Sequence, residues 1–325
     1  MIISTVLLAS LAKPSPPPAP LSGTQPLKRL LVASSIPVAF GAFAPAVQLC
    51  GPLNDAQAIL LQCGTYSVAT ADVAAVRAVR ERSIRVDGRT WRAGVELGLW
   101  ITAAATLESL GLQRTTATRA GFLVRLSTVI VPTAECWMRR TWLPKRLLAA
   151  VLLSAVGVAF IMASSPAGAS VRQATVLGDG LVALSAVLYS AHILRLSAIV
   201  RDRRGEQPIS PWPLATAKAA TQLVCSAAAL AIACLSGAAR SQLSPLPSRL
   251  GPVVLFTGTV ACSYPMWAQA YSQQTVSPSV ASVIYSTAPA FNALIAFVLL
   301  GQGLTPLGVL GAALMMGGML TSVLE

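Results

Sequence analysis

The last part of this sequence lacks the side chains that are charged at neutral pH. The 75 residues from Leu250 to Leu324 contain no Asp, Glu, Lys, Arg or His. A soluble domain has too small an interior to bury so long an uncharged segment, whereas a membrane accepts one helix for about every 20 apolar residues. Two short polar interruptions, 273–278 and 301–303, divide the segment into three pieces of spanning length. The sequence therefore predicts an integral membrane protein whose C-terminal part is three closely linked helices.

Charge is scarce in the whole chain. Only 11% of the 325 residues are charged, against about 25% in a typical soluble domain, and the mean hydropathy is +0.68. The net charge of +13 does not indicate a nucleic-acid partner, because the basic residues are dispersed at the ends of the apolar segments. We expect the lipid bilayer to be the main partner.

Clusters of metal-binding or catalytic residues are also missing. The chain has one His and no paired carboxylate motif, and its six Cys residues stand singly, without the spacing of a zinc site or a disulfide framework. An enzyme working inside the membrane needs such clusters for metal binding or acid–base chemistry. We therefore expect no enzyme activity, no cofactor and no metal, and we keep a lipid-modifying enzyme only as a remote alternative.

Ten apolar segments are long enough to cross a membrane. The second is the weakest, because it contains two glutamines and an aspartate. Before them, residues 1–29 form a Pro-rich, flexible segment that does not resemble a folded element, and whether it is a targeting segment is left open. The predicted spans are 30–50, 54–76, 93–111, 120–138, 147–163, 177–200, 213–236, 251–272, 278–300 and 304–323.

The distribution of basic residues predicts the orientation. The N-terminal tail and the loops after even-numbered spans hold 16 Lys and Arg, and the loops after odd-numbered spans hold 5. By the positive-inside rule, both termini face the cytosol or its equivalent in an organelle, such as the plastid stroma. The plasma membrane and the plastid envelope both remain open.

The chain also has the pattern of an internal duplication. The segment from span three to span five and the segment from span eight to span ten share a Gln- and Thr-containing turn, an apolar helix with Pro132 or Pro289, and a Gly-containing helix. Five spans in each copy is an odd number, so the copies must be inverted, as in many secondary transporters. We predict an all-α membrane protein of about ten transmembrane helices in two inverted five-helix repeats, 30–165 and 177–325.

Several short runs follow one another in order and at regular spacing, at 94–100, 111–113, 115–123, 131–132, 178–186, 299–307 and 311–314. Together they resemble the EamA-type transporters of the drug/metabolite transporter superfamily. The resemblance covers residues 90–325 well and 30–90 loosely, and it implies ten helices and the export or exchange of small metabolites. One departure concerns the turn between the last two helices, where the family commonly has Gly-Glu and this chain has Gly301-Gln302. The role of that glutamate is therefore not carried over.

Polar side chains inside the spans are candidates for the substrate pathway and for ion coupling, because ionisable groups in the hydrocarbon usually face a cavity or a partner. Arg125 either binds a carboxylate in the cavity, pairs with Glu96 or Glu108, or reaches the interface, whereas Lys218 is expected to reach the interface. Glu96 and Glu108 point about 120° apart on one helix and are not expected to act as one pair. The remaining pathway candidates are Thr128, Tyr189, His192, Tyr264, Trp267, Ser282 and Ser286, and the coupling candidates are Asp72, Glu96 and Glu108.

Each of these candidates has a structural alternative. His192 is either a proton relay or a hydrogen-bonded structural residue, and the aromatic stripe with Tyr264 and Trp267 either stacks on substrate or forms an interfacial belt. Small residues in the tenth span are expected to serve close helix packing. In the ninth span, Ser282 and Ser286 either pack or line a path.

The function predicted is a secondary transporter, an exporter or exchanger, of a small organic metabolite that is uncharged or weakly charged. The lack of charge in the last three helices argues against sugar phosphates and nucleotide sugars, which normally require Lys or Arg. An alternative is a transport-inactive paralogue with a structural or regulatory role in the membrane, and a homodimer is left open.

Overall fold

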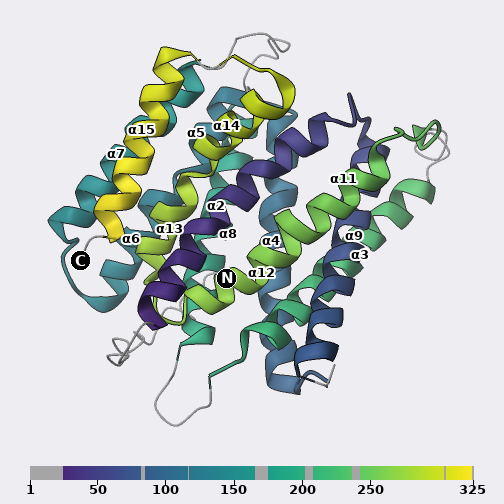
Figure 1. Cartoon of the computed structure of the whole chain (residues 1–325), viewed down its shortest axis with the longest axis horizontal. Helices are drawn as coiled ribbons and strands as arrows, with labels where there is room; N and C mark the ends of the chain where they lie inside the picture. The colour runs from purple at the N-terminus through teal and green to yellow at the C-terminus, as the bar shows by residue number, and fades with distance from the viewer. Residues whose placement is uncertain are drawn as a thin grey trace.

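The computed structural model describes residues 25–81, 85–115, 117–164, 175–201, 208–235, 242–303 and 305–323. Residues 1–24 of the Pro-rich segment lie outside these ranges. All regular structure in the described ranges is helical, as expected for apolar segments that must satisfy every backbone N–H and C=O within the segment (Figure 1).

Eight helices are long and apolar enough to cross a membrane. Two further crossings consist of shorter helices joined end to end, so the described chain makes ten crossings at the predicted positions. The eight are α2 (Gln25–Gln48), α3 (Asp55–Arg80), α4 (Gly88–Leu112), α7 (Lys145–Ser164), α8 (Val176–Val200), α9 (Pro211–Leu235), the pair α13 (Pro278–Ser286) and α14 (Ala288–Leu300), and α15 (Pro306–Val323).

The two crossings made of shorter helices are the fourth and the eighth. The fourth is α5 (Ala117–Val124) followed by α6 (Ser127–Arg139), and the eighth is α11 (Leu250–Phe256), the π-helix η1 (Thr257–Ser263) and α12 (Tyr264–Ser272). The sequence predicted continuous helices here. Irregular backbone at membrane depth is tolerated where protein surrounds it, and π-helical turns are frequent at functional sites.

The helix ends lie at two ends of the bundle, which we call proximal and distal. The proximal end is where α2 begins and α15 ends, because Leu30 near the start of α2 and Val323 pack on the same apolar cluster. At the distal end, Gln302 Nε2 in the α14–α15 turn donates to Oε1 of Gln48, the last residue of α2, at 2.9 Å. With ten crossings, the two ends of the described chain therefore lie on the same side of the bundle.

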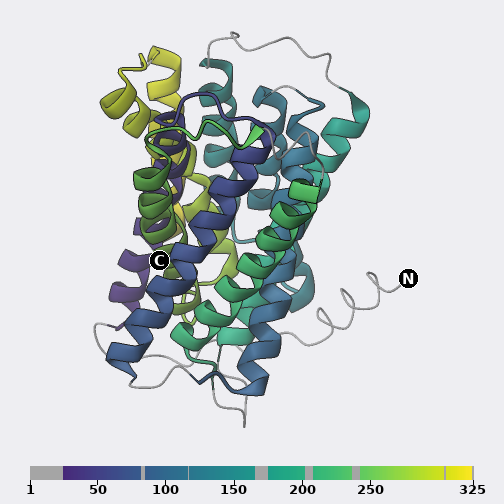
Figure 2. The ribbon, with the colours of Figure 1, turned by 90° about the vertical axis from the view of Figure 1, so that its right-hand side faces the viewer.

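Corresponding helices of the two halves run in opposite directions and have equivalent neighbours. The contact of α2 with α14 corresponds to the contact of α8 with α5 and α6. The contact of α4 with α8 corresponds in the same way to the contact of α12 with α2. The symmetric pairs α3–α9, α6–α13 and α7–α15 join the halves, and Figure 2 shows the face on which α3 and α9 lie side by side. The fold is therefore the predicted all-α bundle with two inverted halves; the boundaries 30–165 and 177–325 stay predictions.

Small residues allow the closest of these contacts. A Cβ atom on Gly157 of α7 would lie 2.5 Å from the carbonyl oxygen of Gly311 in α15, and one on Gly311 would lie 2.6 Å from the carbonyl oxygen of Gly157. The expected packing role of small residues in the last span is confirmed at this contact. The last turns of α6 and α14 are also alike, since Arg140 (φ 53°) and Gly301 (φ 66°) both end a helix in the left-handed conformation.

Candidate functional site

Two side chains that can carry positive charge are buried between the halves of the bundle. Lys218 of α9 is 3% exposed and His192 of α8 is 2% exposed. Lys218 Nζ lies 3.5 Å from Gln269 Oε1 of α12, and His192 Nε2 has no hydrogen-bond partner. The expectation that Lys218 reaches the interface is wrong, because Lys218 is buried on α9 where this helix packs on α4 and α12, with His192 of α8 within electrostatic reach.

The surroundings of Lys218 are polar but neutral. Gln222, one turn further along α9, is 3% exposed and its Oε1 has no partner. Tyr66 of α3 lies beside Gln222, and Cys262 of η1 lies within electrostatic reach of Lys218. No carboxylate contacts Lys218 or His192 among the contacts of the described residues. A buried cation without a counterion is costly, so this central cluster of Lys218, His192, Gln222 and Gln269 is suited to a ligand with acceptor oxygens.

Arg125 lies at the break between α5 and α6. The backbone N–H groups of Arg125 and Leu126 donate three residues back, to Phe122 and Leu123, in place of the α-helical pattern. Glu108 of α4 accepts a hydrogen bond from Tyr189 Oη of α8 at 2.8 Å, and both lie within electrostatic reach of Arg125. The structure thus brings together three predicted residues from three crossings.

The other two carboxylates take separate partners. Glu96 forms a bidentate pair with Arg195 of α8, with N···O distances of 2.5 and 3.0 Å. This pair lines a groove of about 490 Å³ that also contains Arg92. Asp72 of α3 lies beside the π-helix η1, and its Oδ2 is buried without a hydrogen-bond partner. Glu96 and Glu108 do not share a partner, in agreement with their predicted separation on α4.

The aromatic stripe is part of a row of stacked flat groups. Trp267 stacks on Trp212 and on Tyr271, each at 5.1 Å between ring centroids. Arg29 lies over Tyr271 at 5.1 Å and Arg80 over Trp212 at 5.8 Å. These rings therefore pack on one another and between two arginines.

The remaining pathway candidates face inward but form local contacts. Tyr264 Oη and Ser35 Oγ of α2 form a short hydrogen bond. Ser282 and Ser286 are buried and donate to backbone carbonyls of their own helix, at 2.8 and 2.7 Å. Thr128 is 3% exposed, at the start of α6. No contact with the central cluster is seen for these four among the described residues, so their role in a pathway stays a prediction.

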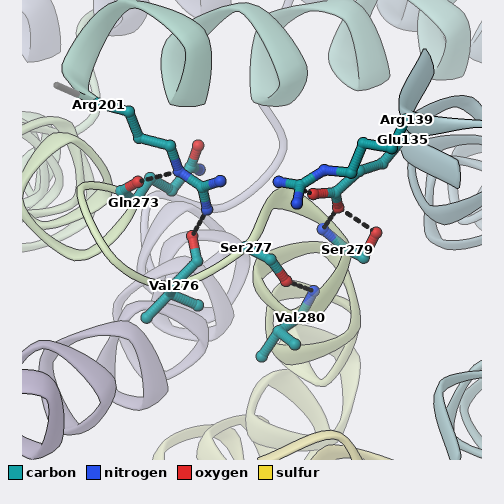
Figure 3. Close-up of polar contacts among 8 residues, drawn as sticks. All are labelled: Glu135, Arg139, Arg201, Gln273, Val276, Ser277, Ser279 and Val280. Carbon is teal, nitrogen blue, oxygen red and sulfur yellow. Dashed lines mark hydrogen bonds and ion pairs between the residues drawn. The ribbon is translucent and has the colours of Figure 1, made fainter. Parts of the chain in front are cut away.

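At the proximal end, charged side chains form hydrogen bonds with neutral groups (Figure 3). Glu135 of α6 is 8% exposed, accepts a hydrogen bond from Ser279 N at 2.9 Å and a short one from Ser279 Oγ, and pairs with Arg139 at 2.8 Å. Arg201, which follows the last residue of α8, donates to the carbonyl oxygens of Gln273 and Val276 at 3.3 and 2.9 Å. These contacts tie the α12–α13 turn and the start of α13 to α6 and α8.

Arg201 keeps its positive charge in this environment. It is 5% exposed, and burial lowers the pKa of its guanidinium to about 10, with nearby Glu135 opposing that shift. A group with a pKa of about 10 is protonated at neutral pH. Its Nη1 has no hydrogen-bond partner.

Sequence reasoning missed Glu135, Arg139 and Arg201 as site residues. Glu135 and Arg139 lie four residues apart in the last turn of a helix, and Arg201 lies just after a span, where basic residues normally define topology. One signal in the sequence could have pointed to them. All three lie at span ends on the same predicted side as the turn between the eighth and ninth spans, and that turn has no charged residue.

The comparisons with known proteins concern the family and the fold. A family model described as the EamA-like transporter family matches residues 178–324. Among solved structures, one described only as a crystal structure of a protein has a TM-score of 0.73 and 16% sequence identity, and the match covers 92% of this chain and 97% of the other. That likeness shows the fold alone. No curated protein has a sequence that matches this chain.

The match to the family model begins within α8 and ends with α15, so it contains the last five crossings. The structural match also includes the first five crossings and concerns the fold alone. The chain is thus a multi-pass membrane protein whose last five crossings match the model of the EamA-like transporter family.

Proposed function

We propose that the protein is a secondary transporter, an exporter or exchanger, that moves a small organic metabolite by alternating access. The observation that carries this proposal is the central cluster, in which Lys218 and His192 are buried between the inverted halves without a carboxylate partner among the described residues. In transporters with inverted repeats, the substrate binds near the midplane between the repeats. The family match over the last five crossings supports the same function.

The substrate is a metabolite that is uncharged or weakly charged. Lys218, Gln222 and Gln269 present donors and acceptors for a polar group, and the row of Trp212, Trp267 and Tyr271 supplies apolar area beside them. A single buried lysine suits one acceptor-rich group better than the two negative charges of a phosphate monoester.

In a transporter that works by alternating access, the contacts of Glu135 and Arg201 at the proximal end would control whether that end is open. A substrate that leaves the central cluster at the proximal end must pass the α12–α13 turn, which Glu135 and Arg201 hold in place. We infer that these contacts form when the proximal end is closed and break when it opens. The excess of basic residues on the loops at this end supports a cytosolic or stromal location for it.

Coupling of transport to an ion would require a group that gains and loses a proton or cation within the membrane. Asp72 is the best placed of the three carboxylates, because it contacts no described cation and lies beside the π-helix of the eighth crossing. Glu96 is held by Arg195, and Glu108 shares its surroundings with Arg125.

The experiment is a comparison of metabolites inside and outside cells with and without the protein, followed by uptake of the changed metabolites into vesicles containing the purified full chain. We expect at least one small organic metabolite to exchange faster than in protein-free vesicles. If no metabolite of the panel exchanges, the structural or regulatory role takes the place of transport, and a lipid product formed in the same vesicles would point to an enzyme.

A further inference from the structure

Two guanidinium groups face each other at the proximal end of the bundle. Figure 3 shows Arg201 and Arg139 approaching from opposite sides, above the start of α13 at Ser277 and Ser279. They come from different halves of the chain, since Arg139 ends α6 and Arg201 follows α8. The arrangement is therefore built by tertiary structure and not by one basic loop.

Not every hydrogen-bond donor of the Arg201 guanidinium group has a partner. Nε and Nη2 donate to the carbonyl oxygens of Gln273 and Val276, but Nη1 is buried without a partner. A buried donor on a charged group that lacks an acceptor costs more than one on a neutral group. Gln273 Oε1 is also buried without a partner, so the α12–α13 turn contributes polar atoms that the protein itself does not satisfy.

The charge at this place does not balance. Among the described side chains drawn in Figure 3, Arg139 and Arg201 contribute two positive charges and Glu135 one negative charge, which leaves one positive charge in excess. The last three helices cannot compensate for it, because residues 250–324 contain no acid. The positive end of the α13 helix dipole adds to the excess.

We propose that Arg201 and Arg139 form a binding site for the carboxylate group of the transported metabolite at the proximal mouth of the bundle. The inference rests on the proposed function, and it narrows the substrate to the weakly charged class, a monocarboxylate. One carboxylate neutralises the single excess charge, and its two oxygens match the planar guanidinium fork. Glu135 holds Arg139 in the absence of substrate, so an arriving carboxylate takes Nη1 of Arg201 and competes with Glu135 for Arg139.

The test uses acetate as the probe and acetamide as its neutral control of the same shape. The purified full chain is placed in lipid nanodiscs at constant ionic strength, and its unfolding midpoint is followed through the fluorescence of its six tryptophans. We expect a saturable rise of the midpoint with acetate and none with acetamide. An equal response to both probes would overturn the proposal.

Variants locate the site. R201Q removes the free donor, and we expect the half-saturating acetate concentration to rise at least tenfold. E135Q removes the competing negative charge, and we expect that concentration to fall severalfold. R140N is the matched control, because Arg140 has the same charge and lies in the same turn as Arg139, but is exposed.

The outcomes separate this inference from the proposed function. If R201Q binds acetate as the wild type does, the site is wrong, whatever the transport assay shows. If R201Q does not fold, the gain of affinity in E135Q decides, and an unchanged affinity there overturns the proposal. If acetate binding depends on Arg201 but no metabolite is transported in vesicles, the site stands and the transport function fails.

Discussion

The first seven crossings and the last three differ in charge, but they meet at three buried charged residues. The first seven supply Glu135, Arg201 and Lys218, whereas residues 250–324 contain no Asp, Glu, Lys, Arg or His. The uncharged helices provide neutral hydrogen-bond partners for these charges. Ser279 N donates to Glu135, two carbonyl oxygens accept from Arg201, and Gln269 Oε1 accepts from Lys218. An uncharged helix can therefore be part of a charged site, because its helix ends and turns provide oriented dipoles.

This comparison changes the argument about substrate charge. From sequence, the lack of charge in the last three helices argued against sugar phosphates and nucleotide sugars as substrates. In the structure, Lys218 of α9 contacts Gln269, and Arg201, which follows α8, contacts Val276. A substrate bound against the uncharged helices can therefore meet positive charge from neighbouring crossings.

The largest expected effect on stability is at Glu135. E135A removes the acceptor of the buried Ser279 N and Oγ and the partner of Arg139, which is 27% exposed, and leaving a buried donor without an acceptor costs about 1–3 kcal/mol. The measurement is the free energy of unfolding in mixed micelles, with D55A, an exposed acid in the first turn of α3, as the control. A loss at Glu135 no greater than that at Asp55 would contradict the described contacts.

A smaller effect is expected where one charge meets another at the surface. Glu96 and Arg195 form a bidentate pair, but their side chains are 30% and 28% exposed. Solvent screening limits such pairs to about 1 kcal/mol, so E96Q should cost less than E135Q in the same unfolding assay. A larger loss of unfolding free energy in E96Q than in E135Q would contradict this. It would show that ion pairs stabilise the bundle more than hydrogen bonds from charged residues to the neutral helices do.

The smallest effect is expected at the turn that departs from the family pattern. Q302E places a carboxylate at an exposed position whose side chain contacts only Gln48 among the described partners. Surface substitutions of this kind usually change stability by about 0.5 kcal/mol or less. We expect unfolding and vesicle transport to match the wild type, and a large gain of transport in Q302E would instead assign the missing glutamate a functional role.

The positions of the crossings could be predicted because lipid imposes a simple rule on apolar segments. All ten predicted spans coincide with helical crossings of the described chain. The breaks at Arg125 and at 257–263 could not be found, because a turn or a π-helix at membrane depth depends on neighbours that replace the lost backbone contacts.

The site was only partly accessible from sequence for the same reason. Arg125, Glu108 and Tyr189 were named separately and lie together in the structure. Lys218 was expected at the interface because helix position alone does not show which neighbours surround a side chain. Glu135 and Arg201 resemble ordinary residues at span ends, and only tertiary structure shows that they hold the α12–α13 turn.

The most direct test of the account is exchange of a labelled metabolite by vesicles containing the wild type, K218M or K145M. Lys145 begins α7 and is exposed, so K145M loses the same charge away from the bundle interior. We predict that K218M lowers the exchange rate at least tenfold, while K145M stays within about twofold of the wild type, as expected for a surface substitution. Exchange by K218M at the rate of the wild type would contradict a substrate site built by charged crossings against the uncharged helices.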